Sequence, residues 1–512
     1  MQYDEVTLRC LAKNKFESAL VSFTKRQMFF YFCCGISLFL LLLYRWDYFI
    51  FLMTAWFSVL YFGSVLFRVG AALVSLLGLG ERKITDAELK SSDDENLPVY
   101  TVLVPLYKEA NIARKILRNI MDFDYPKEKL DIKILLEADD IRTLEAVRLC
   151  GFADMLDVIV VPDSMPRTKP RACNWGLEKA VGEFCVIYDA EDRPEPDQLK
   201  KAVLAFRSSP EKVVCIQAKL NYYNQRQNIL TRFFTIEYST TFDLFLPGLE
   251  TLKVPVPLGG TSNHFRTGIL REIGGWDPFN VTEDCELGMR IYKRGYSTIM
   301  INSTTWEEAN SKPWNWIRQR SRWVKGYIQT HFVHARSPVE TCRALGPWGF
   351  AGFYLTVGAG VQMMLMNVFY WIVGIFYLTM FLVGLNQGYT AKEIIVGPHS
   401  SGTYSGVMFY GMDLKAWPLV YYGPDEGGGW VVLSIVFFSI SLLLVLANFL
   451  FVGIHCLACV KRRYYSLLPF ALLMPFYWLF ISFGAWKGFI QFFTKPFYWE
   501  KTVHGFDGGE NP

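Results

Sequence analysis

Asp189, Glu191 and Asp192 stand almost side by side in the sequence. Asp189 ends residues 183–189, a short apolar run that is typical of a buried strand, and the other two acids follow it. Carboxylates gathered at a strand end can hold a divalent cation, and the cation can neutralise a diphosphate. The alternative is a polar turn, because two prolines follow. The density of acids favours a metal site among these three residues.

A second pair of acids, Glu283 and Asp284, follows Thr282. A carboxylate here could take the proton of an attacking hydroxyl, provided that the fold places it beside the reacting groups. The alternative is structural, because a helical pattern runs over Glu286–Lys293 and an Asp ahead of a helix is a common N-cap. Asp284, with Glu283 beside it, is therefore a candidate catalytic base.

A third group of residues, Gln319, Arg322 and Trp323, forms a Q-x-x-R-W pattern. Apolar residues around it recur at helical spacing with basic residues among them, which is typical of an amphipathic helix at a membrane surface. Taken alone, these side chains would be a solvated face and a bilayer anchor. The acids upstream give the pattern a second interpretation, in which it binds a charged ligand.

The segment that carries these acids alternates predicted strands with helical patterns. Short apolar runs at Pro98–Pro105, Asp131–Glu137 and Glu183–Asp189 are typical of buried strands. Strands that alternate with helices form a parallel sheet, and such sheets bind ligands at the carboxyl ends of their strands. We therefore expect an α/β (Rossmann-like) domain with its site at that edge.

Long apolar segments flank this domain on both sides. Met28–Tyr44 and Tyr48–Leu79 are each long enough to cross a hydrocarbon core, and Trp348–Leu385 and Trp430–Val460 are two further apolar runs. We expect Trp348–Leu385 to cross once after an interfacial segment, because two crossings would place the basic cluster at 461–463 outside. Tyr464–Phe493 is interrupted by prolines, which predicts a broken or re-entrant element.

Four crossings follow from this interpretation, and a six-span arrangement is the competitor. Lysines and arginines flank the first two spans, so the catalytic domain and both chain ends are expected in the cytoplasm of a multi-pass cell-membrane protein. The predicted divisions are an N-terminal segment with two spans (1–80), the α/β domain (81–310), amphipathic interfacial helices (311–347), transmembrane helices with an extracellular loop at 386–429 (348–460) and an interfacial helix with a C-terminal segment (461–512).

Composition agrees with a membrane protein. Hydrophobic residues make up 52% of the chain and charged residues only 20%, whereas soluble domains carry about 25% charged residues. The net charge of +4 is too small to indicate nucleic acid as a partner. The 11 cysteines show no paired spacing that would predict a disulfide framework.

The order of the motifs resembles that of the cellulose synthase-like family 2 glycosyltransferases, which have a GT-A fold. The resemblance covers nearly the whole chain, and its motifs are specific together although each is weak alone. They are Val104–Glu109, the acidic end of Leu136–Asp140, Lys169–Asn174, Asp189–Asp192, Thr282–Asp284, Gln319–Trp323 and an aromatic Lys-Thr segment, Phe497–Thr502.

The resemblance implies a role for each motif on the donor side. Asp189 and Glu191, with Asp192 next door, would bind Mg²⁺ or Mn²⁺ and the diphosphate, while Asp284 would deprotonate the acceptor. The other residues implied to bind the donor are Tyr107, Glu109, Glu137, Asp139, Arg171, Gln319, Arg322 and Lys501.

On the acceptor side, Trp323 would stack on the terminal sugar, and the small residues Thr261 and Ser262 would let the chain end approach. Trp499 and Thr502 resemble a gating loop over the nucleotide. Two departures leave assignments open: Glu191 and Asp192 compete for the metal, and Glu137 and Asp139 compete for the nucleobase. The chain resembles the shorter bacterial β-glucan and exopolysaccharide synthases more than cellulose synthases proper.

The reaction that the resemblance implies is processive, inverting transfer from a UDP-sugar, with UDP-glucose as the expected donor. The growing polysaccharide, the lipid bilayer and accessory export or cell-envelope proteins would be its partners. Single transfer to a lipid acceptor is the enzymatic alternative. A transporter without catalysis would carry ionisable side chains within its spans; we expect the apolar runs to lack them.

Overall fold

The computed structural model describes residues 3–388, 408–409, 412–413, 446–498 and 500. Predictions for Trp499, Lys501 and Thr502 therefore lie outside the described residues. The same holds for most of the loop at 386–429 and for the first half of the run Trp430–Val460, of which the helix Leu446–Lys461 is described.

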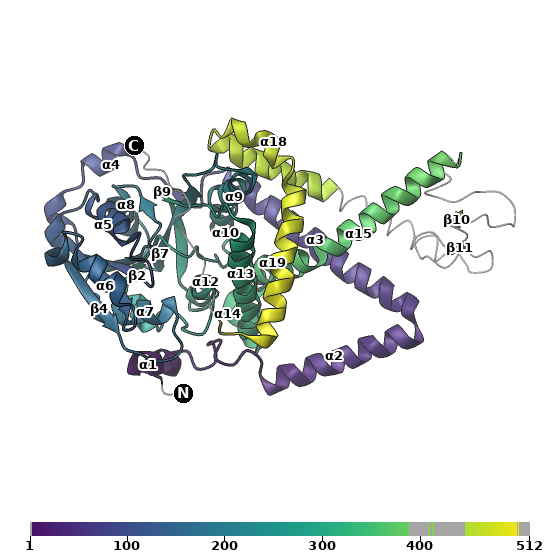
Figure 1. Cartoon of the computed structure of the whole chain (residues 1–512), viewed down its shortest axis with the longest axis horizontal. Helices are drawn as coiled ribbons and strands as arrows, with labels where there is room; N and C mark the ends of the chain where they lie inside the picture. The colour runs from purple at the N-terminus through teal and green to yellow at the C-terminus, as the bar shows by residue number, and fades with distance from the viewer. Residues whose placement is uncertain (1–2, 389–407, 410–411, 414–445, 499, 501–512) are drawn as a thin grey trace.

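One large mixed sheet forms the centre of the domain (Figure 1). Neighbouring strands run parallel except where β8 and β6 pair antiparallel with their neighbours. In spatial order the strands are β1 (Glu81–Arg82), β9 (Ser297–Glu307), β7 (Val213–Tyr222), β8 (Asn263–Arg266), β5 (Phe184–Ile187), β2 (Tyr100–Leu106), β3 (Leu130–Glu137) and β4 (Leu156–Val161), and β6 (Arg193–Pro194) pairs with β9.

The three strands predicted from apolar runs are confirmed as β2, β3 and β5. They are adjacent and parallel, with Val102 opposite both Ile132 and Val186. Their carboxyl ends therefore meet at one edge of the sheet, where side chains from loops far apart in the sequence can converge.

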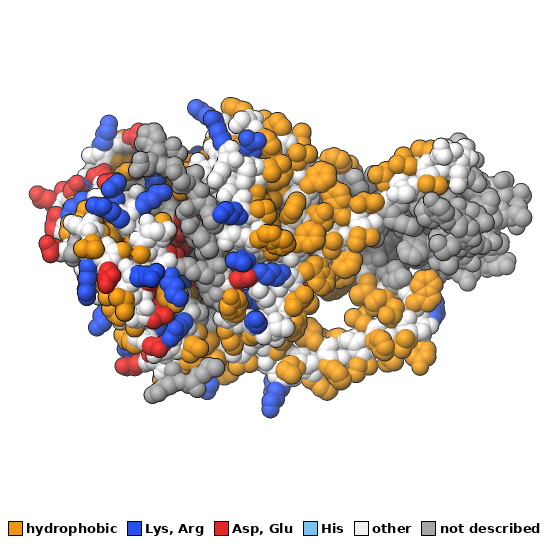
Figure 2. All heavy atoms as spheres, in the orientation of Figure 1, with side chains coloured by type: hydrophobic (Ala, Val, Ile, Leu, Met, Phe, Trp, Pro, Cys, Tyr) orange, Lys and Arg blue, Asp and Glu red, His pale blue; other side chains and the backbone are white. Residues whose placement is uncertain are grey.

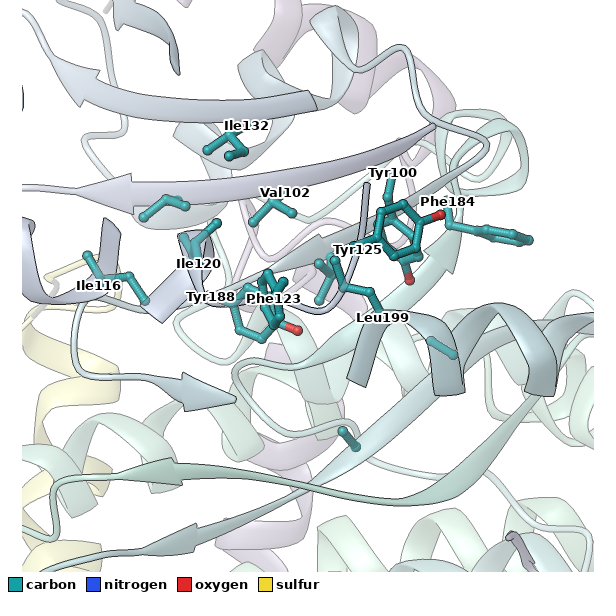
Figure 3. Close-up of a cluster of buried hydrophobic side chains, with 14 of the residues drawn as sticks. Tyr100, Val102, Ile116, Ile120, Phe123, Tyr125, Ile132, Phe184, Tyr188 and Leu199 are labelled. Carbon is teal, nitrogen blue, oxygen red and sulfur yellow. The ribbon is translucent and has the colours of Figure 1, made fainter. Parts of the chain in front are cut away.

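Helices cover both faces of this sheet. Successive side chains of a strand point to opposite faces, and the two hydrophobic cores divide accordingly: Val102 packs in one core and Leu103 in the other. Figure 3 shows the first core, where α5 and α8 cover the strands. The helices over the sheet are α4 (Asp86–Lys90), α5 (Ala113–Met121), α6 (Ile141–Arg148), α7 (Lys169–Lys179), α8 (Gln198–Arg207), α11 (Thr267–Glu272) and α12 (Glu283–Lys293).

A second layer of helices joins the sheet to the apolar part of the chain. α9 (Ile229–Thr240), the π-helical turn η4 (Thr241–Phe245) and α10 (Leu246–Thr251) lie against β7 and β9. α13 (Pro313–His334) carries the Q-x-x-R-W pattern and packs along α19 (Met474–Thr494), as Figure 1 shows. The amphipathic helix predicted there is confirmed as a helix.

By length and composition, three described helical stretches could cross a membrane: Lys25–Tyr44, Ala55–Ser75 and Pro338–Ile372. A bent pair, Tyr465–Ala471 and Met474–Thr494, turns by 66° and would make a fourth, which agrees with the break predicted over Tyr464–Phe493. These stretches belong to α2 (Lys25–Tyr44), α3 (Trp46–Ser75), α14 (Pro338–Phe353), the π-helical turn η5 (Tyr354–Gly358), α15 (Ala359–Asn386), α18 (Leu468–Ala471) and α19.

The surface has a charged part and a hydrophobic part, which correspond to the α/β domain and to the long apolar segments of the sequence. In Figure 2, Lys, Arg, Asp and Glu side chains gather over the strand-rich part, and a broad hydrophobic surface covers the long helices. Large apolar side chains are exposed there, among them Phe29, Leu43, Phe480 and Phe493. Such a surface is compatible with association with a membrane.

The expectation that the apolar runs lack ionisable side chains is wrong at Arg68. This residue lies within Ala55–Ser75, and its guanidinium donates a hydrogen bond to the carbonyl of Thr356 (3.2 Å) in η5. It is a single charge among apolar residues, so the mean hydropathy of the run is still 1.8.

Candidate active site

A cavity of about 460 Å³ lies where the carboxyl ends of β2, β3 and β5 face α12 and α13. It brings together residues from each of the six motifs between Val104 and Trp323. The predicted site residues that line it are Tyr107, Glu109, Glu137, Asp189, Glu191, Thr261, Glu283, Asp284, Gln319, Arg322 and Trp323.

The acidic end of β5 faces this cavity through Asp189 and Glu191. The Nζ atom of Lys169, in the first turn of α7, lies 2.5 Å from Oδ1 of Asp189 and donates to the carbonyl of Gly260 (3.0 Å). Burial lowers the pKa of Lys169, but the charges of Asp189 and Glu283 outweigh it and raise the pKa overall. Lys169 therefore stays charged and pairs with the acid.

Asp192 is fully buried and does not line the cavity. Its carboxyl accepts the N–H of Asp189 (2.7 Å) and hydrogen-bonds to the hydroxyl of Thr261. Burial, followed by the charges of Asp189 and Glu191, raises the pKa of Asp192 well above its ordinary value. Asp192 thus fixes the shape of the acidic loop. Ser262 is also turned inward, where its hydroxyl donates to Thr305 (2.6 Å).

The residues present fit a divalent cation. In the described part of the chain, no three His, Cys, Asp or Glu side chains already converge as a ligand set. Mg²⁺, however, is usually held by one or two carboxylates together with substrate phosphates, and Asp189 and Glu191 supply two. Asp189 already contacts the cation of Lys169. Burial and the charges of Asp192, Glu191 and Asp189 raise the pKa of Glu307, which lines the same wall.

Asp284 lies in the first turn of α12, whose N-cap is Thr282, so the N-cap alternative for Asp284 is wrong. Its Oδ1 accepts the N–H of Cys285 (2.6 Å), and a Cβ atom added to Gly260 would lie 3.2 Å from Oδ2. The glycine therefore keeps open the space in front of the carboxylate.

Burial raises the pKa of both acids at the start of α12. For Glu283, burial and the charge of Asp284 raise the pKa to about 7. For Asp284 burial also dominates, while Lys169 and Arg322 partly offset it. A carboxylate of raised pKa is a better proton acceptor, and Asp284 is the more exposed of the two.

The Q-x-x-R-W residues on α13 form the wall opposite the acids. Oε1 of Gln319 is buried with no hydrogen-bond partner within the described chain. Burial lowers the pKa of the Arg322 guanidinium. The negative charges of Glu283, Asp284 and Asp189 offset this effect in part. Trp323 packs near Tyr238, with ring centroids 6.3 Å apart.

Where β3 reaches the cavity, the two acids that were predicted as alternatives, Glu137 and Asp139, have different surroundings. Glu137 lines the cavity and pairs with Arg171 (2.9 Å), whereas Asp139 lies outside the lining and accepts the hydroxyl of Tyr107 (3.2 Å). Arg171 is fully buried behind Glu137 and also contacts Asp4, the N-cap of α1 (Glu5–Lys13), at 3.4 Å. Arg171 therefore does not line the cavity itself, but it contacts Glu137, which does.

Residues 184–387 match the profile of the family described as "Glycosyl transferase family group 2". This part of the chain is similar to glycosyltransferase family 2 domains. The match includes β5, α12 and α13, which carry the acids and the Q-x-x-R-W residues.

Two curated relatives are glycosyltransferases by name. The chain is 30% identical over 249 residues to "Probable glycosyltransferase YdaM" of Bacillus subtilis (strain 168), covering 47% of this chain and 58% of the relative. It is 23% identical over 241 residues to "Probable glucomannan 4-beta-mannosyltransferase 11" of Arabidopsis thaliana, covering 46% and 54%. The chain thus spans little more than half of the length of these relatives.

Among solved structures, a mannosyltransferase from Pyrobaculum calidifontis, PcManGT, in complex with GDP-Man and Mn²⁺ is 20% identical. The alignment covers 60% of this chain and 92% of that chain, with a TM-score of 0.38.

Two residues that line the cavity, Glu307 and Lys169, had no predicted role. Glu307 ends β9, so the rule that found Asp189, an acid at a strand end, would also have found it. Lys169 stands in the same motif as Arg171, and only the structure shows that the lysine faces the cavity while the arginine faces inward.

Proposed function

We propose that the chain is a membrane-embedded, inverting β-glycosyltransferase that extends a polysaccharide from a UDP-sugar. One observation carries the proposal: a single cavity joins the acids of β5, the base candidate on α12 and the Gln, Arg and Trp of α13. A transferase needs these three functions within reach of one another, because donor, base and acceptor meet at one carbon atom.

The donor would lie along the carboxyl edge of the sheet. Tyr107, Glu109 and Glu137 would bind the nucleotide, and Asp189 with Glu191 would hold Mg²⁺ or Mn²⁺. The bound metal would neutralise charge on the diphosphate. Arg322 and Gln319 face the same space from α13 and would bind the diphosphate from the other side.

Asp284 would act as the general base. The open space before Gly260 admits an acceptor hydroxyl, whose proton moves to Oδ2 of Asp284 as its oxygen attacks the anomeric carbon. The bond from this carbon to the diphosphate breaks in the same displacement. A single displacement converts an α-linked donor into a β-linked product, so no covalent enzyme intermediate is needed.

A second cavity supports extension of a polymer over transfer of one sugar. It has a volume of about 140 Å³ and shares Arg68, Glu237 and Met364 with the first. Its remaining walls come from the long helices and include Tyr477 and Trp478. A chain that is extended beside Trp323 could pass from the first space into the second, towards the export side.

The membrane arrangement belongs to the same proposal. Four crossings would hold the domain and both termini in the cytoplasm, Trp499, Lys501 and Thr502 would close over the bound nucleotide, and accessory cell-envelope proteins would receive the product. The alternative acceptor is a membrane lipid that takes a single sugar, because the second cavity lies among the long apolar helices.

Incubation of the purified full chain with labelled UDP-glucose, Mg²⁺ or Mn²⁺ and membrane lipid separates these possibilities. A ladder of long, β-glucanase-sensitive product is the expected result. One labelled sugar on an extracted lipid would overturn the polymerase proposal, and GDP-mannose in a parallel reaction tests the choice of donor.

A further inference from the structure

Arg320 occupies the first of the two free positions within the Q-x-x-R-W pattern. Both terminal nitrogens of its guanidinium donate to the carboxylate of Glu237 on α9, and one also donates to the hydroxyl of Tyr477 on α19 (2.9 Å). The Tyr477 hydroxyl donates in turn to Oε2 of Glu237 (2.7 Å). The three side chains therefore form a closed polar cluster that joins α9, α13 and α19.

The guanidinium of Arg320 is buried yet charged. Burial lowers the pKa of Arg320, but the charge of Glu237 outweighs this effect and raises the pKa overall. A buried ion pair adds little net stability, because both charges give up their water. Two parallel hydrogen bonds between a guanidinium and a carboxylate do, however, fix the relative direction of the two side chains. We therefore look for the effect of this pair in the geometry of its neighbours.

The neighbour that lines the cavity is Trp323, one turn further along α13. The guanidinium carbon of Arg320 lies 4.6 Å from the centroid of the Trp323 ring. From α9, the rings of Phe234 and Tyr238 lie with their centroids 5.9 and 6.3 Å from that of Trp323. Glu237 stands between these two residues in the sequence of α9. The ring of Trp323 is thus packed against the helix that supplies the carboxylate.

α19 approaches α13 closely beside the same arginine. A Cβ atom added to Gly484 would lie 2.8 Å from the Cβ of Arg320, and one added to Gly488 would lie 2.5 Å from the carbonyl oxygen of Ser321. Glycine is unfavourable inside a helix, so these two positions indicate that the close approach matters. It leaves the backbone at Arg320 little room to move.

We propose that Glu237, acting through Arg320, positions the ring of Trp323 for the acceptor sugar. A binding side chain is effective when the residues behind it lock its rotamer by packing and hydrogen bonds, and a sugar stacks only on a ring of fixed direction. Tyr477 supports the same carboxylate. The inference rests on the proposed function, in which Trp323 holds the terminal sugar, and adds positioning residues from α9 and α19.

Fluorine nuclear magnetic resonance reports the ring of Trp323 without any substrate. The purified full chain is produced with 5-fluorotryptophan at its 15 tryptophans, and Trp323→Phe identifies the resonance of interest. Glu237→Gln should broaden or split this resonance, because the ring is no longer held in one direction. A resonance that stays single and sharp, even if shifted by the lost charge, would overturn the inference. If Glu237→Gln fails to fold, Tyr477→Phe decides by the same criterion, since it removes only the hydroxyl.

Transfer kinetics with UDP-glucose and cellotetraose link the ring to the acceptor. Glu237→Gln should raise the KM of cellotetraose by about tenfold, the loss that one stacking contact represents, and leave the KM of UDP-glucose unchanged. An unchanged KM of cellotetraose would overturn the inference. A raised KM together with a sharp Trp323 resonance would also overturn it, in favour of direct binding of the sugar by Glu237.

The matched control is Lys133→Gln, which breaks a buried ion pair with Asp131 and Asp157 (both 2.8 Å) in the sheet. It should lower the melting temperature and alter neither KM nor the Trp323 resonance. A broadened Trp323 resonance in this control would overturn the inference, because loss of any buried pair would then loosen the ring. If the unaltered chain transfers no sugar, the proposed function fails, whereas the resonance still decides whether Glu237 holds the ring.

Discussion

The Nζ atom of Lys169 lies 2.5 Å from Oδ1 of Asp189. The carboxylate that begins the acidic loop is therefore already bound by a cation of the chain. Lys169 also donates to Gly260, the residue in front of Asp284. This lysine thus links the two acidic groups.

The first prediction separates the metal-facing acid from the structural one. Asp189→Asn should raise the Mn²⁺ concentration needed for half-maximal transfer by about tenfold or more, because one carboxylate ligand is lost. Asp192→Ala should instead lower the free energy of unfolding by about 1–3 kcal/mol, since the Asp189 N–H and the Thr261 hydroxyl lose their acceptor. Transfer rates after chelation and metal addition, and denaturant unfolding, measure the two effects. Similar metal responses in both variants would contradict this division of roles.

The second prediction concerns the base. Asp284→Asn should lower kcat by about 10²–10⁴-fold and leave the KM of the donor almost unchanged, because general-base catalysis is lost while the donor contacts remain. Steady-state kinetics with a fixed acceptor measures both constants. Glu211→Gln, at an exposed carboxylate, is the control and should behave as the unaltered protein. Full turnover by Asp284→Asn would remove Asp284 from the mechanism.

The third prediction is the pH dependence of kcat. Asp284 must be deprotonated to accept a proton, and burial holds its pKa above the ordinary value. Activity should therefore fall as the pH drops, with a midpoint higher than about pH 4, the range of an exposed Asp. Arg322 lowers the pKa of Asp284, so Arg322→Gln should move the acid limb of the profile to higher pH. A limb that stays in place or moves to lower pH would show that Asp284 does not govern it.

The fourth prediction tests the link between the N-terminal helix and Glu137, which lines the cavity. Asp4→Asn keeps an oxygen for the N-cap of α1 but removes one of the two acids that contact Arg171. Glu137 would then face the buried guanidinium alone, and the KM of the donor should rise severalfold with little change in kcat. Arg9→Gln, which breaks a surface pair between α1 and Glu178, is the matched control. An unchanged KM in Asp4→Asn would limit α1 to a structural role.

Much of the fold could be predicted because its signals are local. An apolar run that ends in acids identified β5 and Asp189, and helical spacing identified α13. That Glu191 lines the cavity while Asp192 is buried could not be predicted, since it depends on how the turn meets Thr261, far along the chain. The contact of Arg171 with Asp4 is likewise a product of tertiary packing.

Arg68 was also not predicted, because hydropathy averaged over a window responds little to one charged residue. Its neighbours in the sequence are apolar, so a run of this length is still predicted to be a membrane span. Its surroundings depend on tertiary packing, because Thr356 and Glu237 come from distant parts of the sequence.

The stereochemistry of transfer tests the central claim most directly. Nuclear magnetic resonance of the first product formed from UDP-α-glucose, in the presence of Mn²⁺, reports the configuration at the anomeric carbon. The proposed single displacement with Asp284 as base predicts a β-linkage from the first turnover. An α-linked product, or no transfer from any nucleotide sugar, would contradict the account.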